Sequence, residues 1–254
     1  MILTWYNTAA LSVQTKNNSV LFDPFLPLKG SRVLTAPSDY DGFFDIFLTH
    51  AHLDHIVSLP LLCRRQSRRL FGTQAVQTAL AELGVEKSAV EVIRSGDEKQ
   101  VGDILVKAFH GKHVRYDGKT LYHTFCNVRM FRYAYNIPPI LRENRICQEN
   151  GETTAYLVRA EGKSVFILGS LNLLPDAIYP TDVDLIVLPY QGTSDLLTPA
   201  LEIIDRIRPK AVLLDHFDDT FPPLSRTIDT GDIERALRNK LPLHKLENGG
   251  KLEL

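Results

Sequence analysis

The feature that most constrains this chain is a dense run of histidines directly after a short apolar segment. Residues 43–49 (Phe-Phe-Asp-Ile-Phe-Leu-Thr) are typical of a β-strand buried on both faces, and His50, His52, Asp54 and His55 follow at once. Imidazole and carboxylate groups are good ligands for zinc, iron and manganese. If the extended conformation continues through His52, alternation of side chains places His50 and His52 on one face, where both can bind one ion. A turn after this point would bring Asp54 and His55 close enough to hold a second ion.

The remaining chain alternates short strands with helices and contains no internal repeat. Its content of 44% hydrophobic and 23% charged residues is that of an ordinary globular protein. The pattern predicts a loop over 23–37, and it predicts helices over 59–69, 73–83, 199–207 and 232–239. It predicts strands over 3–6, 9–15, 19–22, 90–93, 104–109, 153–158, 164–168, 185–188, 211–214 and 251–254. Strands come first in meanders and later alternate with helices, so we expect an α/β (α+β) fold with both parallel and antiparallel pairing.

Charge and cysteine usage limit the class of partner. The net charge of -1 argues against a dedicated nucleic-acid binder, which is usually clearly basic. The three cysteines are far apart and form no metal-binding pair, which favours a reducing compartment. We see neither a signal peptide nor an apolar run of the roughly 18 residues that a membrane span needs. We therefore expect a cytoplasmic protein that acts on a small molecule, without nucleic acid or membrane.

The H-x-H-x-D-H pattern after a buried strand resembles that of the metallo-β-lactamase superfamily. The resemblance covers essentially the whole chain, and among the branches it looks most like the ascorbate-phosphate lactonases. It implies a four-layer αββα sandwich, one domain over residues 1–254, with the metal site along one edge of the sheets. It also implies one or two zinc ions, with manganese or iron as alternatives. Asn7 through Pro24 resembles the opening hairpins of the family, and Asp23 is the aspartate that would orient a ligand histidine.

The resemblance supplies two further ligand positions. In the segment 106–113 the resemblance favours His113 as a metal ligand. His110 would then lie behind that ligand or face the substrate. The alternative is that His110 is the ligand instead of His113. After the apolar strand 212–214 the resemblance points to His216. The implied site thus has His50, His52 and His113 around one ion. Asp54, His55 and His216 surround the other, and Asp54 is the catalytic residue that ligates, orients the water or accepts its proton.

One position departs from the family pattern. Where the family has an aspartate that bridges two metals, this chain has Ser170 after Gly169. A neutral hydroxyl compensates the repulsion of two dications poorly in a site of low dielectric. We therefore expect the second ion to bind more weakly, or to recruit Asp215, Asp218 or Asn172 instead.

The stretch 114–151 is long for a strand connection and is rich in aromatic and basic residues. One interpretation is a wall over the metal site, in which aromatic rings pack on a substrate and arginines hold an anionic group. The other is a local excursion with a small core of its own and a solvated basic face. The candidate substrate contacts are Arg115, Tyr116, His123 and Arg132.

A second basic cluster lies in the helix expected after the histidines. Arg64, Arg65, Arg68 and Arg69 would share one side of that helix. A solvated face is the favoured interpretation, and an anion contact is the alternative.

Three functions follow from these residues. The leading hypothesis is a metal-dependent hydrolase that uses a metal-activated water on a small anionic substrate, with a lactone or phosphoester bond as target. An RNA- or phosphodiester-cleaving enzyme is the alternative enzyme. A degenerate member that binds metal without catalysis is the third hypothesis, and Ser170 motivates it. Aromatic residues of the 114–151 stretch could equally form a homo-oligomer contact.

Overall fold

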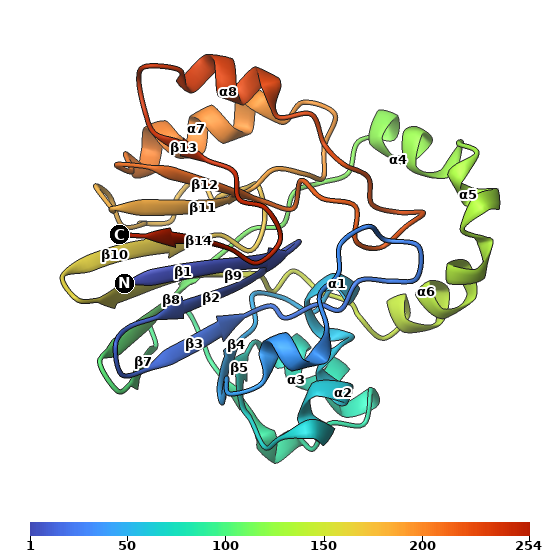
Figure 1. Cartoon of the computed structure of the whole chain (residues 1–254), viewed down its shortest axis with the longest axis horizontal. Helices are drawn as coiled ribbons and strands as arrows, with labels where there is room; N and C mark the ends of the chain where they lie inside the picture. Colours follow the sequence, from blue (N-terminus) through green and yellow to red (C-terminus); the bar gives the residue numbers. More distant parts are fainter.

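Two seven-stranded sheets face each other, with helices on their outer faces (Figure 1). The computed structural model describes residues 1–254. The first sheet has the order β14-β1-β2-β3-β4-β5-β6 and the second the order β13-β12-β11-β10-β9-β8-β7. Helices α2 and α3 lie beyond the first sheet, and α7 and α8 lie beyond the second (Figure 1). The expected four-layer αββα sandwich of mixed sheets is therefore confirmed.

The strands and helices have the following bounds. The strands of the first sheet are β1 (Ile2–Asn7), β2 (Ala10–Gln14), β3 (Ser19–Phe22), β4 (Asp45–Phe47), β5 (Arg69–Gly72), β6 (Val90–Val92) and β14 (Gly250–Glu253). Those of the second are β7 (Glu98–Val101), β8 (Ile104–His110), β9 (Thr154–Ala160), β10 (Lys163–Ile167), β11 (Leu185–Pro189), β12 (Val212–Asp215) and β13 (Leu243–His244). The α-helices are α1 (Leu53–Ile56), α2 (Leu59–Arg65), α3 (Gln74–Glu82), α4 (Gly118–Phe125), α5 (Arg129–Arg132), α6 (Ile137–Asn144), α7 (Leu197–Ile207) and α8 (Gly231–Leu237). Short 3-10 turns occupy Pro37–Tyr40, Lys87–Ala89 and Ala134–Asn136.

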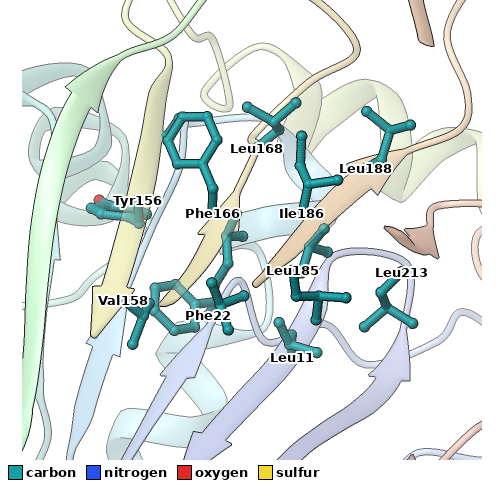
Figure 2. Close-up of a cluster of buried hydrophobic side chains, with 14 of the residues drawn as sticks. Leu11, Phe22, Tyr156, Val158, Phe166, Leu168, Leu185, Ile186, Leu188 and Leu213 are labelled. Carbon is teal, nitrogen blue, oxygen red and sulfur yellow. The ribbon is translucent and has the colours of Figure 1, made fainter. Parts of the chain in front are cut away.

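Side-chain alternation divides the apolar residues of the first sheet between two cores. In β4, Phe47 belongs to the core between the sheets, whereas Ile46 belongs to the core under α2 and α3. In β5, Phe71 and Leu70 are divided in the same way. This is the two-residue period of a strand covered on both faces, and it explains why these strands are apolar at consecutive positions. Figure 2 shows the core between the sheets, where side chains of β2 and β3 lie among those of β9 to β12.

The predicted helix over 59–69 is wrong in its second half. Helix α2 ends at Arg65, and β5 begins at Arg69. The four arginines therefore do not share a helical side. Arg68 is buried and its guanidinium donates to the carbonyl oxygen of Phe43, while Arg69 pairs with Asp45 across the strands. Pairing of β5 with β4 outweighs the local helix preference of this basic run, because it extends the sheet over a buried core.

The 114–151 stretch forms three short helices on one side of the sandwich (Figure 1). Helix α4 begins after Asp117, whose carboxylate accepts a hydrogen bond from the backbone N–H of Thr120 at 2.8 Å. Ile140 of α6 is buried in the core under the first sheet. No helix in the structure combines the length and the apolar character needed to cross a membrane.

Candidate metal centre

The histidine run lies where β4 leaves the first sheet. Strand pairing stops at Phe47, the chain bends at Thr49, and His52 has an extended backbone, with φ -72° and ψ 157°, directly before α1. The rings of His50 and His52 converge, with His50 Nε2 3.0 Å from His52 Nδ1. The start of α1 then turns Asp54 and His55 toward the same place. The predicted facing pair and the predicted turn are both present.

Six of the predicted ligand residues assemble into two adjoining groups. His50, His52 and His113 form one group, and Asp54, His55 and His216 form the other. Within each group the candidate ligand atoms all lie within 4.8 Å of one another. The rings of His50 and His55 have centroids 3.9 Å apart, which joins the two groups.

The histidines of the first group are uncharged at neutral pH, as binding of a metal cation requires. Burial lowers the pKa of His50 well below its usual value, and burial, with the neighbouring His113 as a second cause, lowers the pKa of His52 to about 4. Burial also lowers the pKa of His113. The three imidazoles are therefore neutral at pH 7, with lone pairs available for coordination. Three imidazoles are the protein donor set of one class of catalytic zinc site.

The second group contains one carboxylate, and further carboxylates lie around it. Burial opposes ionisation of Asp54, but the neighbouring His55 and His216 hold its pKa below the ordinary value. Burial likewise opposes protonation of His216, but the carboxylate of Asp215 and those of Asp54 and Asp218 together raise its pKa to about 9. The carboxylates of Asp54, Asp215 and Asp218 thus favour a positive charge next to His216. The donor set of one carboxylate and two imidazoles fits a divalent cation as well.

Asp23 lies behind the second group and orients it. Its carboxylate accepts hydrogen bonds from the Thr49 backbone N–H at 2.9 Å and from the Thr49 hydroxyl at 2.7 Å. The same carboxylate lies 3.0 Å from His55 Nδ1, so His55 Nε2 is left to face Asp54 and His216. A carboxylate behind a ligand histidine fixes its ring orientation and tautomer. The structure places Asp23 where the resemblance implied.

The backbone at His216 has an unusual, left-handed conformation. Its φ is 58° at the end of β12, and its backbone N–H donates to the carbonyl oxygen of Thr8 at 3.0 Å, where Thr8 itself has φ 41°. The Thr8 N–H donates in turn to Asp218 at 2.9 Å. Left-handed backbone at a β-branched residue is strained and persists only where the surroundings enforce it. Sequence reasoning missed Thr8, because nothing in its local pattern marks a contact with residues so far along the chain.

The residues considered as replacements for the missing bridge have other partners. Asp218 binds Thr8, and Asp215 lies 3.3 Å from His216 Nδ1 on the side away from His55. The Ser170 hydroxyl accepts a hydrogen bond from the Val114 backbone N–H at 3.0 Å, and the Asn172 side chain donates to the carbonyl oxygen of His113 at 3.3 Å. Ser170 and Asn172 therefore hold the segment that carries His113.

Gly169 brings Ser170 to this position. A Cβ atom on Gly169 would lie 2.7 Å from Thr49 Cβ and 2.8 Å from the Thr154 carbonyl oxygen. Only glycine allows the chain after β10 to approach the end of β4 so closely. The Gly-Ser pair therefore reaches the lining of the site, at the position that the resemblance implied.

His110 and His113 have different surroundings. His110 is the last residue of β8, exposed, with its backbone N–H bonded to the Ser95 hydroxyl at 3.0 Å, and it lies outside both groups. His113 Nδ1 lies 2.7 Å from the Val114 carbonyl oxygen, which leaves Nε2 free to face His50 and His52. The alternative of His110 as a ligand is not supported by this geometry, because the chain turns after β8.

A cavity of about 270 Å³ opens over the two groups. The 114–151 stretch forms part of its wall, through Tyr116, Ile140, Asn144 and Gln148. The predicted substrate contacts Arg115, His123 and Arg132 do not line it. Arg115 and His123 point to solvent, and Arg132 packs over the Tyr133 ring at 5.5 Å. The stretch is thus a wall over the site, while Arg115, His123 and Arg132 lie outside the lining, and their role as substrate contacts stays a prediction.

Other lining residues come from loops that sequence reasoning did not single out. Gln191 and Gly192 follow β11, and Phe221 and Leu224 follow β12. Their one sequence signal is position. The parallel strands β11 and β12 end at the same edge of the sheet, and β12 leads directly into His216. Neither loop carries a motif with recognisable chemistry.

Comparison with known proteins gives consistent matches. Residues 18–217 match the model of the beta-lactamase superfamily domain. A UPF0173 protein of Pyrococcus abyssi is 33% identical over 113 residues, which are 44% of this chain and 50% of that protein. A UPF0173 metal-dependent hydrolase of Methanopyrus kandleri is 24% identical over 89% of this chain and 87% of its own length. The solved structure of Igni18, a metallo hydrolase from Ignicoccus hospitalis, superimposes with a TM-score of 0.64 at 17% identity, covering 100% of this chain and 98% of its own.

Proposed function

The chain belongs to the beta-lactamase superfamily domain family, and from this premise we propose that it is a metal-dependent hydrolase of a small molecule. One observation carries the proposal: two groups of three ligand-type side chains adjoin on the floor of a single cavity. We propose that His50, His52 and His113 hold one divalent cation and that Asp54, His55 and His216 hold a second, zinc being the preferred ion. The names of the relatives support hydrolysis.

The roles of the side chains follow from their positions. A bound divalent cation would supply Lewis acidity, which lowers the pKa of water toward about 7. Asp54 faces the cavity, and its lowered pKa keeps it ionised at neutral pH, so it is placed to accept a hydrogen bond from the attacking water and orient it. Asp23 and Thr49 keep His55 oriented. Tyr116 and Ile140 close the cavity from the side of the 114–151 helices and limit the size of the substrate.

The cavity lining favours a carboxylic ester or lactone over a phosphodiester. No lysine or arginine is among the residues that line it. Enzymes that act on phosphodiesters usually place cationic side chains against the substrate phosphates. This observation also argues against an RNA-cleaving enzyme and against the strongly anionic substrate expected from the arginines of the 114–151 stretch.

Metal removal combined with a substrate panel tests the proposal. The protein is dialysed against a chelator, divided, and reloaded with zinc or manganese. Metal content and hydrolysis of a lactone, p-nitrophenyl acetate and bis(p-nitrophenyl) phosphate are then measured. We expect uptake of one or two ions per chain, hydrolysis only after reloading, and faster turnover of the ester and the lactone. A protein that takes up neither metal in excess would contradict the proposal.

Ser170→Asp is expected to raise the metal content of the protein. A carboxylate at this position can replace the serine hydroxyl as acceptor of the Val114 N–H and also adds a negative charge beside both groups. The measurement is the number of zinc ions per chain at limiting free zinc. The matched control is Ser170→Asn, which adds similar bulk without charge and should leave the stoichiometry at the parent value. Equal zinc content in all three proteins would refute this account of the missing bridge.

A further inference from the structure

A second cavity opens beside the candidate metal centre. It has a volume of about 290 Å³ and lies between α4, α6 and the segment 221–228. Apolar side chains from both helices line it, among them Leu121, Phe125 and Leu141. Only one charged residue, Arg226, is among the lining residues, and it is exposed. The cavity therefore suits an uncharged, apolar group.

The two cavities adjoin. Tyr116, Ile140, Phe221 and Leu224 line both of them. A molecule with one end over the candidate metal ligands can thus extend past Ile140 into the apolar cavity. The shared lining places the second cavity within reach of a molecule whose reactive bond lies in the first.

The lining includes apolar surface that the chain itself leaves uncovered. Leu121, Phe125 and Leu141 are 44%, 54% and 59% exposed, although each is a large apolar side chain. Exposed apolar surface around a concavity often marks a ligand-binding site. Burying these side chains against a ligand would remove them from water at a gain of roughly 25 cal/mol per Å².

We propose that this apolar cavity binds the acyl chain or ring of the substrate, whose ester or lactone carbonyl lies at the candidate metal centre. The proposal rests on the proposed function, and it names the substrate class: a carboxylic ester or lactone with a medium-length apolar substituent. Selectivity then arises from the helices of the 114–151 stretch. The chemistry arises from the histidines and Asp54.

The proposal predicts a dependence on chain length. Each methylene that enters the cavity contributes about 0.8 kcal/mol, which corresponds to about a fourfold gain in affinity. Because the cavity touches a part of the substrate that does not react, the gain is expected in KM while kcat stays constant. Once the cavity is filled, longer chains should bring no further gain.

Two measurements on the full-length protein test this. The first is the KM of the metal-loaded protein for p-nitrophenyl acetate, butyrate, hexanoate and octanoate. The second is displacement of a bound polarity-sensitive dye, anilinonaphthalene sulfonate, by 1-butanol, 1-hexanol and 1-octanol from the metal-free protein. The dye experiment needs no catalysis, so it distinguishes failure of the apolar site from failure of the proposed hydrolysis.

Phe125→Glu is the test variant, because it places a charge in the lining at a position already half exposed and so tolerated by the fold. Phe131→Glu is the matched control: it lies in α5 of the same stretch, is 86% exposed and does not line the cavity. We expect Phe125→Glu to abolish the dependence on chain length in both measurements and Phe131→Glu to retain it. Equal affinities for short and long chains in the parent protein would overturn the proposal. So would a parent dimer that Phe125→Glu dissociates, since the patch would then be a contact between copies.

Discussion

If the proposed function holds, replacing His113 with alanine is expected to remove one divalent metal ion from the protein and to lower kcat/KM for the proposed ester or lactone substrate by about 10³-fold. The ring of His113 meets His50 and His52 at centroid distances of 5.0 and 4.4 Å, and its loss leaves two imidazoles where three are needed. A catalytic cation contributes several kcal/mol to stabilisation of the transition state, and each 1.36 kcal/mol corresponds to a factor of ten. Zinc content and steady-state kinetics measure both effects.

The matched control is His110→Ala. Its ring lies outside both groups, while its backbone N–H and carbonyl oxygen, which bind Ser95 and Tyr179, stay in place after the substitution. We expect parent values for zinc content, activity and thermal stability. If His110→Ala lost metal and His113→Ala did not, the assignment of the first group would be reversed. Equal retention of zinc and activity in both variants would remove His113 from the site.

Asp23→Asn is expected to weaken metal binding at the second group by about 10- to 100-fold and to lower the free energy of unfolding by about 1–3 kcal/mol. The buried carboxylate accepts from the Thr49 N–H and hydroxyl and lies 3.0 Å from His55 Nδ1. An amide has one oxygen acceptor, so at least one of these donors loses its partner. Asparagine also tolerates the φ of 43° at this position, which separates the hydrogen-bond effect from backbone strain.

The comparison for Asp23→Asn is Asp45→Asn, which neutralises another buried aspartate of the same layer. Asp45 pairs with Arg69 at 2.6 Å and touches neither ligand group. Chemical denaturation and zinc titration of the two variants give the measurements. Both variants should lose stability, and only Asp23→Asn should lose zinc affinity. Loss of zinc affinity in both would mean that the effect is a general loosening of the fold.

Local patterns in the chain were sufficient for much of the fold. Consecutive apolar residues such as Ile46 and Phe47 indicate a strand covered on both faces, and the structure divides these two between separate cores. The histidine run after that strand predicted a facing pair, and His50 and His52 do converge. Where the local preference competed with the sheet, at Arg68 and Arg69, the prediction was wrong. Helix propensity is weak compared with the burial gained by extending a sheet.

What the sequence determined by itself was the nature and place of the ligand cluster from His50 to His55, because those residues are neighbours along the chain. The resemblance named His113 and His216 as the distant residues that join them, but only the tertiary structure shows how the fold brings them there. His216 reaches the cluster through a strained turn held by Thr8, and His113 does so because Ser170 holds the adjacent backbone. Such contacts depend on where separate strands end and how the chain leaves them, and no local periodicity encodes that. The helices of the 114–151 stretch became a wall of the site for the same reason.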